Sequence, residues 1–177
     1  MQTYIALLRG INVSGKNIIK MEALRLAMQE LAFAHVRTYI QSGNIIFNSK
    51  TTNTTTLAKC IKDKITTNFG FNVPVAVFNS AYLNNVINAN PFLNYNQQLL
   101  HVTFLSQIPK QDLVAKINGD FNTDEFIIID KHIYIFCPNG YGKTKLTNNF
   151  FENKLKLQAT TRNWKTLETL ATMATTI

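Results

Sequence analysis

The sequence predicts an α+β fold of two tandem ferredoxin-like halves, each a four-stranded antiparallel sheet in the order βαββαβ. Apolar residues make up 46% of the 177 residues and charged residues only 16%, so the chain can bury a core. Strand-like runs and helical periodicity alternate in the βαββαβ order, and the same order then occurs again without repetition of the residues. We place the halves at residues 1–78 and 99–177, with a linking helix and loop at 79–98 and a C-terminal helix at the end of the second half.

The first half begins with an apolar run at residues 3–9, which ends in a loop rich in glycine and asparagine. Met21, Leu24, Met28 and Leu31 recur at helical spacing, which predicts a helix over residues 20–33. The remaining expected elements are strands at 36–40 and 45–48 around a turn at 42–44, a helix after the threonine-rich segment 51–56 that ends at Gly70, and a strand at 73–78. Pro74 confines this last strand to a sheet edge or a strand start, and the fourth strand of a ferredoxin-like sheet lies at an edge.

A short linking helix is expected over residues 80–90, with Ser80 as its N-cap and Asn90-Pro91 as its stop. The second half then repeats the pattern. Its expected elements are a strand at 100–105, a short helix at 109–117, strands at 125–129 and 132–136, a loop at 138–142, a helix carrying Leu146, Phe150 and Leu155, and a strand at 158–161. The C-terminal helix places Trp164, Leu167, Leu170 and Ala174 on one face.

The formal net charge is +8, and it is unevenly distributed. Residues 1–78 contain nine Lys and Arg against three Asp and Glu, whereas residues 79–177 contain nine against seven. A basic surface suggests an anionic partner, such as a nucleotide, a phosphorylated small molecule or a nucleic acid. A solvated surface that only keeps the protein soluble is the alternative.

Other features exclude several classes of protein. No run approaches the roughly 20 apolar residues of a membrane span, so no membrane partner is expected, and the N-terminus is typical of a first strand rather than a signal peptide. Cys60 and Cys137 form no CxxC pair, which indicates free thiols and a cytoplasmic location. His35, His101 and His132 are scattered, so no metal site is expected. No cofactor motif is present, and we expect no cofactor.

Residues 10–17 match the GxxxxGK spacing of a phosphate-binding loop and follow a strand. A Ser or Thr should follow the lysine to bind magnesium, but Asn17 stands there, and the helical pattern starts only near Lys20. Phosphate-loop ATPases also have an acidic residue at the end of a second apolar strand. Asp130 follows such a strand, but it lies in the two-residue turn to the next strand. We therefore expect no ATPase that depends on Lys16.

A second glycine-rich loop, at residues 137–144, contains the sequence Gly-Lys-Thr at an expected helix N-terminus. Its backbone N–H groups, together with Lys143 and Lys145, are candidates to hold an anion. The alternative is an ordinary glycine-rich loop with exposed lysines.

A cationic, amide-rich cluster is expected at one end of the first sheet. In a βαββαβ unit, the loop after the first strand and the turn between the second and third strands emerge at the same end. The candidate ligand-binding residues there are Arg9, Asn12, Lys16, Lys20, Gln41, Ser42 and Asn44. The alternative is that these amides only tie the loops together.

In the second half, Arg162 and Asn163 are expected at the end of the sheet that also holds the loop 138–145. Asn163 or Thr161 has the alternative role of capping the final helix, and Trp164 is expected in the core. These clusters contain no Ser/His/Asp set and no paired carboxylates, so the catalytic residues stay undefined. RNA binding through the sheet is poorly supported, because Phe47 is the one aromatic residue in its strand.

Seven segments together resemble the bacterial family known as domain of unknown function 1697. These are residues 7–13 (LLRGINV), 15–17 (GKN), 20–21 (KM), 39–44 (YIQSGN), 90–92 (NPF), 145–148 (KLTN) and 160–164 (TTRNW). Ser14 stands where the family often has glycine, Thr144 where it often has serine, and Lys165 where asparagine is common. The resemblance implies a cytosolic bacterial protein with two ferredoxin-like halves, and it implies no activity.

We interpret the sequence as that of a protein that binds a phosphate-bearing anion in a cleft between its halves, with Arg9 and Arg162 facing a common groove. One alternative is an enzyme acting on a nucleotide or phosphorylated metabolite, with Lys16, Lys143 and Arg162 as electrostatic groups. Another is a nucleic-acid-binding protein that uses the basic first half. The sequence decides neither the ligand nor the oligomeric state.

Overall fold

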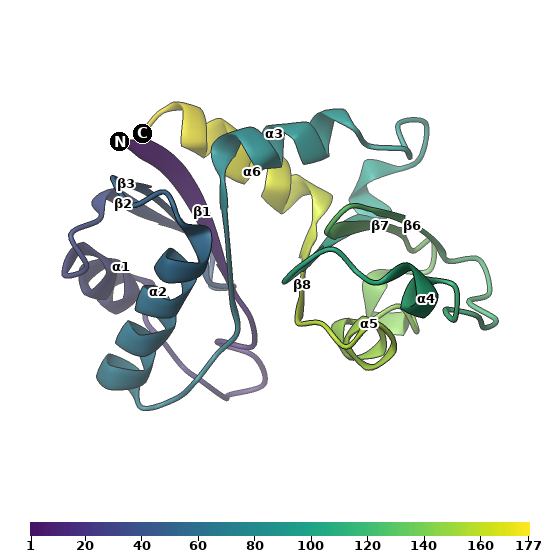
Figure 1. Ribbon diagram of the computed structural model, residues 1–177, viewed down its shortest axis with the longest axis horizontal. Helices are drawn as coiled ribbons and strands as arrows, with labels where there is room; N and C mark the ends of the chain where they lie inside the picture. The colour runs from purple at the N-terminus through teal and green to yellow at the C-terminus, as the bar shows by residue number, and fades with distance from the viewer. The chain divides into compact units, whose positions relative to one another are not determined.

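The computed structural model describes residues 1–177 and confirms two four-stranded antiparallel sheets, each in a ferredoxin-like arrangement, with an additional C-terminal helix (Figure 1). The chain forms two compact units. Unit 1 consists of Met1–Asn85 with Thr169–Ile177, and unit 2 consists of Val86–Glu168. The boundaries between them fall inside α3 (Ser80–Asn88) and α6 (Trp164–Thr175). None of the helices is long and apolar enough to cross a bilayer.

Unit 1 has its strands in the order β2-β3-β1-β4, all antiparallel to their neighbours. Its elements besides the shared helices are β1 (Gln2–Leu8), α1 (Met21–Gln29), β2 (Ala34–Tyr39), β3 (Asn44–Ser49), α2 (Thr54–Phe69) and β4 (Val75–Asn79). The edge position predicted for the fourth strand is confirmed. Pro74 lies directly before β4, where a missing N–H removes no hydrogen bond within the strand.

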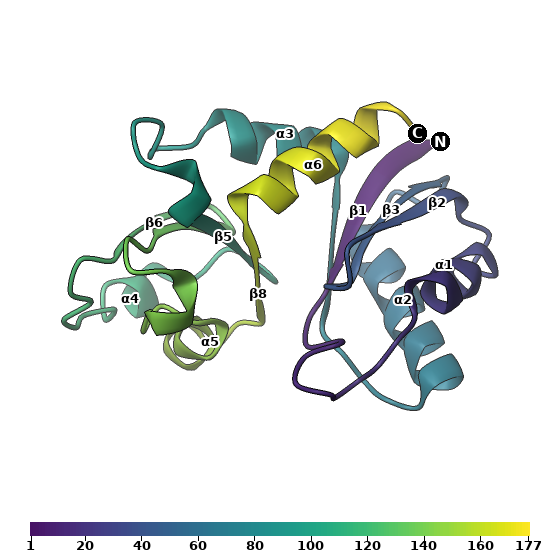
Figure 2. The ribbon, with the colours of Figure 1, turned by 180° about the vertical axis from the view of Figure 1, so that it is seen from behind.

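Helices α1 and α2 cover one face of this sheet (Figures 1 and 2). The predicted α2 stripe of Leu57, Ile61 and Ile65 is buried against the sheet. The helix starts where the Asn53 side chain accepts a hydrogen bond from the Thr56 N–H, and it ends at Gly70 in a left-handed conformation (φ +79°).

The opposite face of the same sheet is buried as well. Ile5, Leu7 and Ile46 lie on it and have no exposed surface. The last turns of α6 belong to this unit, and Arg37 on β2 donates a hydrogen bond to the hydroxyl of Thr176 (3.1 Å). Burial on both faces explains why β1 is a continuous apolar run rather than an alternating one.

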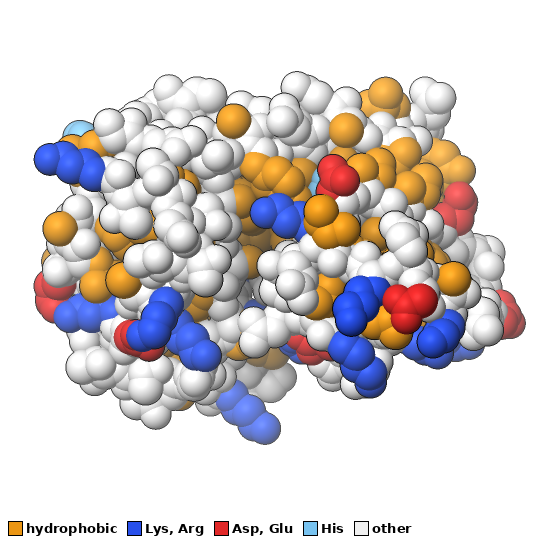
Figure 3. Space-filling view, in the orientation of Figure 1, with side chains coloured by type: hydrophobic (Ala, Val, Ile, Leu, Met, Phe, Trp, Pro, Cys, Tyr) orange, Lys and Arg blue, Asp and Glu red, His pale blue; other side chains and the backbone are white.

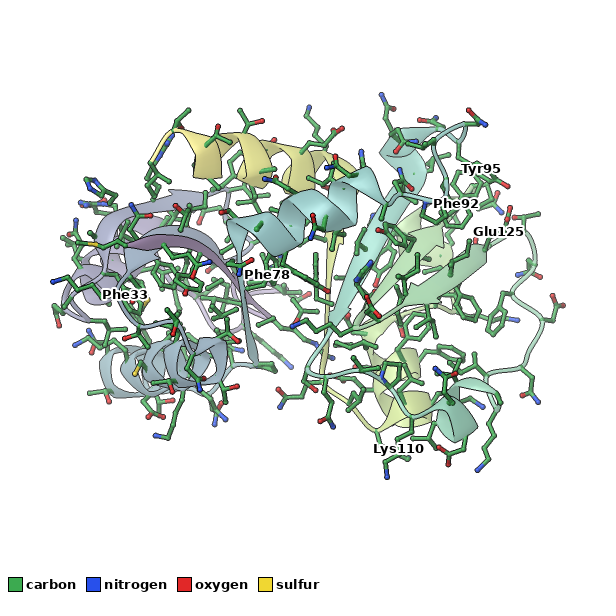
Figure 4. The ribbon with its side chains drawn as sticks, turned by 45° about the horizontal axis from the view of Figure 1, so that its top comes forward. Phe33, Phe78, Phe92, Tyr95, Lys110 and Glu125 are labelled. Carbon is green, nitrogen blue, oxygen red and sulfur yellow. The ribbon has the colours of Figure 1, made fainter.

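Unit 2 has its strands in the equivalent order β6-β7-β5-β8. Its own elements are the 3₁₀ helix Gln97–Leu99, β5 (Leu100–Leu105), α4 (Gln111–Val114), β6 (Glu125–Ile129), β7 (His132–Phe136), the 3₁₀ helix Tyr141–Lys143, α5 (Asn148–Leu155) and β8 (Ala159–Asn163). Helices α4 and α5 lie on one face of the sheet (Figures 1 and 2). At the opposite side of this unit, Figure 4 shows Tyr95, Phe92 and Glu125 near one another. Tyr95 packs edge-on against Phe92, and its hydroxyl donates to the Glu125 carboxylate (3.3 Å).

The repeat extends to individual hydrogen bonds. In each unit, the N–H of the last residue of the first strand donates to the residue just before the third strand. The N–H of the following residue donates to the residue just before the fourth strand. The bonds are Leu8 N to Gly43 O (2.8 Å) and Arg9 N to Pro74 O (3.0 Å) in unit 1, and Leu105 N to Lys131 O (2.8 Å) and Ser106 N to Gln158 O (3.0 Å) in unit 2. The two halves therefore have the same architecture at this end, although their residues differ.

Several helix boundaries differ from the sequence prediction, among them that of α3, which ends at Asn88 instead of residue 90. α1 ends at Gln29 instead of residue 33, because the chain leaves the helical conformation and Ala32 is left-handed (φ 57°). α4 is shorter than the predicted helix over 109–117 and covers Gln111–Val114. The N-cap role predicted for Ser80 was wrong: the carboxamide oxygen of Asn79 accepts the hydrogen bond from the Tyr82 N–H (2.8 Å).

Candidate functional site

The predicted cluster of loops at one end of the first sheet is present, and Asn12 holds it together. Its side-chain amide donates to the carbonyl oxygens of Ile19 (3.0 Å) and Gln41 (3.0 Å), and its side-chain oxygen accepts from the Ile19 N–H (2.8 Å). The loop 9–20 is thereby bonded both to itself and to the turn between β2 and β3.

The loop after β1 does not have the structure of the GxxxxGK loop of ATPases, in which a helix starts at the lysine. Val13 and Lys16 form an isolated bridge around Ser14 (φ 49°) and Gly15 (φ +73°), the pattern of a tight two-residue turn with both central residues left-handed. Lys20 is still extended, and α1 begins only at Met21. Lys16 therefore lies at the end of a hairpin and not at the start of a helix, as the sequence predicted.

The turn before β3 is tightly packed beneath this loop. A Cβ on Gly43 would lie 2.7 Å from the Leu8 Cβ, so a side chain at Gly43 has no room. Asn44 is completely buried, and its amide donates to the Tyr39 carbonyl oxygen (3.0 Å). The amides of Asn12 and Asn44 are therefore engaged in tying the loops together, which was the structural alternative for this cluster.

The remaining candidates of unit 1 lie at the surface. Lys16, Lys20, Gln41 and Ser42 are exposed, and Arg9 is half-buried. Neither Lys16 nor Lys20 makes an ion pair. We call these five residues the polar end of unit 1.

The acidic groups of the first half are paired elsewhere. Each of the three carboxylates among residues 1–78 bonds a different cation, in the pairs Glu22–Arg25, Glu30–Lys64 and Asp63–Lys59. The lysines of the polar end are therefore not neutralised by any acid of their own half. This leaves a local excess of positive charge on a rigidly bonded loop.

The second glycine-rich loop does not form the predicted helix N-terminus. Tyr141–Lys143 is a 3₁₀ turn, and α5 begins at Asn148 because the Thr147 side chain caps it by accepting from the Phe150 N–H. Lys143 is exposed, but the ammonium group of Lys145 donates to the Asp120 carbonyl oxygen (3.0 Å). The two lysines thus do not converge on a helix start.

Arg162 and Asn163 lie at the same end of their sheet as this loop. The Tyr141 ring stacks on His101 (4.4 Å between centroids), and His101 pairs with Asn163 across the strands. Arg162 is half-buried, donates to the Thr161 carbonyl oxygen (2.9 Å), and has its pKa lowered to about 10 by burial. Asn163 caps α6 by accepting from the Thr166 N–H (2.8 Å), and Trp164 is buried, as the alternative interpretation held.

Two hydrogen-bonded polar chains in unit 2, one partly buried and one buried, were not found by sequence reasoning. The Thr103 hydroxyl bonds the Thr161 hydroxyl (2.6 Å), which donates to the side-chain oxygen of Asn148 (2.7 Å). On the other face, His132 bonds the Tyr134 hydroxyl (3.2 Å), which donates to the Val86 carbonyl oxygen (2.6 Å). The sequence signal that could have revealed these chains is the presence of the polar residues Thr103 and His132 within apolar strands.

The chemistry of these buried groups is structural. Burial raises the pKa of Tyr134 to about 12, so its hydroxyl stays protonated as a donor. Burial raises the pKa of Cys137 to about 11, which disfavours the thiolate that a nucleophile needs. No group of three or more His, Cys, Asp or Glu lies close enough together to hold a metal ion.

Comparison with known proteins agrees with the fold. The model of a family described as "Protein of unknown function (DUF1697)" matches residues 1–134. The chain belongs to this family. A conserved bacterial protein, SP0830 from Streptococcus pneumoniae, has a similar structure, with a TM-score of 0.78 and 22% identity over 98% of each chain. No curated protein matches the sequence.

The family motifs gain a physical explanation in unit 1. Two of the family segments, 7–17 and 39–44, form the loop after β1 and the turn before β3. The Asn12–Gln41 and Leu8–Gly43 hydrogen bonds join this loop to this turn. Ser14, where the family often has glycine, occupies a left-handed position that glycine adopts without strain. That Arg9 and Arg162 face one groove stays a prediction.

Proposed function

We propose that this DUF1697 protein binds a phosphate-bearing small anion at the polar end of unit 1. The observation that supports the proposal is the pair of exposed lysines, Lys16 and Lys20, on a loop whose backbone is held by hydrogen bonds. Arg9, Gln41 and Ser42 lie on the same bonded loops and add donors that suit phosphate oxygens.

Rigidity favours binding over a merely solvated surface. The Val13–Lys16 bridge and the bonds of Asn12 fix the loop that carries both lysines, so an anion does not have to order it. Pre-organised donors bind more tightly because less conformational entropy is lost.

A compact anion fits better than a nucleic acid. Two of the other cations of the first half that no acid pairs lie apart from the polar end. Lys50 follows β3 at the opposite end of the sheet, and Arg37 on the edge strand bonds Thr176. Long nucleic acids are bound by a continuous stripe of cations that tracks the backbone, and these residues do not support one.

No observation favours an enzyme over a binding protein in this chain.

Cytoplasmic location is part of the proposal. It is supported by the two free cysteines, of which Cys60 is exposed, since free thiols are typical of reducing compartments.

The test measures binding of AMP, ADP, pyrophosphate and a 20-nucleotide RNA to the full chain by thermal shift and calorimetry. We expect saturable binding of one small phosphate compound, weakened about three- to tenfold in the Lys16→Gln/Lys20→Gln double variant. The matched control is Lys50→Gln/Lys62→Gln, which removes the same charge elsewhere in the first half and should leave the affinity unchanged. Equal loss in both double variants, or affinity that grows with RNA length and falls steeply with salt, would contradict the proposal.

A further inference from the structure

Unit 2 contains a pocket of about 310 Å³. It lies at the end of the sheet that corresponds to the polar end of unit 1, next to the bonded pair Ser106 and Gln158. In unit 1 the connection 9–20 places Ile11 and Ile19 in the core. The corresponding connection in unit 2 is only residues 106–110, and its Ile108 is 64% exposed. The shorter connection therefore leaves a space that unit 1 fills.

The walls of the pocket are apolar, and its polar groups are two lysines and an amide. The lining consists of Ile108, Leu113, Leu155 and Leu157, together with Lys110, Lys156 and Gln107. Leu155 is buried in the hydrophobic core of unit 2, so this apolar wall is continuous with the core. Over α4 and α5, Figure 3 shows several basic side chains together with an acidic one and some apolar ones, and Lys110 extends from the lower side of this unit in Figure 4.

The two lysines are exposed and make no ion pair. Their backbones are fixed: the Lys110 carbonyl oxygen accepts from the Leu113 N–H (3.0 Å), and Lys156 ends α5 in a left-handed conformation with its N–H on the Glu152 carbonyl oxygen (2.9 Å). No acidic side chain lines the pocket. The neighbouring acids along the chain are Asp112, an exposed residue of α4 between Lys110 and Leu113, and Glu152 of α5, which accepts a hydrogen bond from the Ala159 N–H (3.0 Å).

We propose that this pocket binds a small amphiphilic carboxylate, a molecule with a short alkyl chain and one anionic head. The leucine walls would bury the chain, and Lys110 and Lys156 would bind the carboxylate at the mouth. The volume lies near the lower end of the roughly 300–1,000 Å³ of small-molecule sites, so it suits a chain of modest length rather than a nucleotide. The site is independent of the polar end of unit 1.

The experiment titrates the ¹⁵N-labelled full chain with octanoate, and in parallel with 1-octanol and acetate, which represent its two parts. We expect saturable amide shifts at Leu113, Leu155 and Leu157 with octanoate, and weaker binding of both partial ligands. The variant Lys110→Gln/Lys156→Asn should bind octanoate about three- to tenfold more weakly and octanol unchanged. Asn is chosen because it tolerates the left-handed conformation of Lys156.

The matched control is Lys154→Gln, an exposed lysine of the same helix that does not line the pocket. Leu113→Gln, in the half-buried wall, should weaken both octanoate and octanol. Absence of saturable octanoate binding, equal affinity for octanol, or an equal effect of Lys154→Gln would overturn the proposal. Binding to anionic phosphatidylglycerol vesicles but not to monomeric octanoate would instead indicate a membrane surface and refute it too.

Discussion

Asn12 stabilises unit 1 more than its position in a surface loop suggests. Replacing it with glycine removes three hydrogen bonds, two donated to carbonyl oxygens of Ile19 and Gln41 and one accepted from the Ile19 N–H. Glycine keeps the left-handed backbone of this residue (φ 54°), so the change tests the side chain rather than strain.

The expected loss is set by comparison with Asn17, which has nearly the same backbone conformation (φ 50°) but only one side-chain bond, to the Gly10 carbonyl oxygen (2.9 Å). Asn17→Gly therefore carries the same backbone entropy cost. A net hydrogen bond contributes about 1 kcal/mol, and the bond to Gln41 is exposed and contributes less. Asn12→Gly should lower the free energy of unfolding by about 1–2 kcal/mol more than Asn17→Gly.

Urea unfolding followed by far-ultraviolet circular dichroism measures this difference. Hydrogen exchange of the Ile19 amide adds a local readout, because its acceptor in the folded chain is the Asn12 side chain. Equal destabilisation by the two glycine variants, or an unchanged exchange rate at Ile19, would refute the role of Asn12 as the link between the loops.

Three further predictions concern stability. Ser14→Gly should raise the free energy of unfolding by about 0.5 kcal/mol, since it relieves a left-handed conformation at φ 49°; a lower urea midpoint would contradict this. Gly43→Ala should cost about 3 kcal/mol, because its Cβ would lie 2.7 Å from that of Leu8, and a cost under about 1 kcal/mol would show that the turn yields easily. Burial lowers the pKa values of His101 and His132, so the unfolded chain takes up these protons at higher pH than the folded chain, and stability should fall as the pH drops below about 6.5. A urea midpoint that stays level from pH 7.5 to pH 5.5, or that falls just as far in the His101→Gln/His132→Gln variant, would count against that assignment.

Much of the fold was predictable from local patterns. The order of strands and helices was confirmed in both halves, because hydrophobic periodicity and turn residues act over a few neighbouring positions. Pro74 allowed an edge or a strand start for β4, and the ferredoxin-like order of the elements placed this strand at an edge. The rejection of an ATPase phosphate loop also rested on local signals, namely Asn17 after the lysine and a helical pattern that starts only near Lys20.

The candidate site depended on contacts that no local pattern contains. Asn12 and Lys16 look alike as polar loop residues, yet the amide is bonded to Gln41, 29 positions away, while the lysine is exposed. The Gly-Lys-Thr segment resembles a helix start, but Thr147 is the residue that caps α5.

The sequence by itself determined the elements, their order and the excess of positive charge in the first half. Only the tertiary structure decided which amides hold loops together and which cations stay exposed. It also showed that the short connection 106–110 leaves a pocket between apolar side chains of α4 and α5. The physical reason is that element formation depends on near neighbours. Loop contacts and cavities depend on strand register, here the pairing of β1 with β3, which brings residues 7 and 44 together across the sheet.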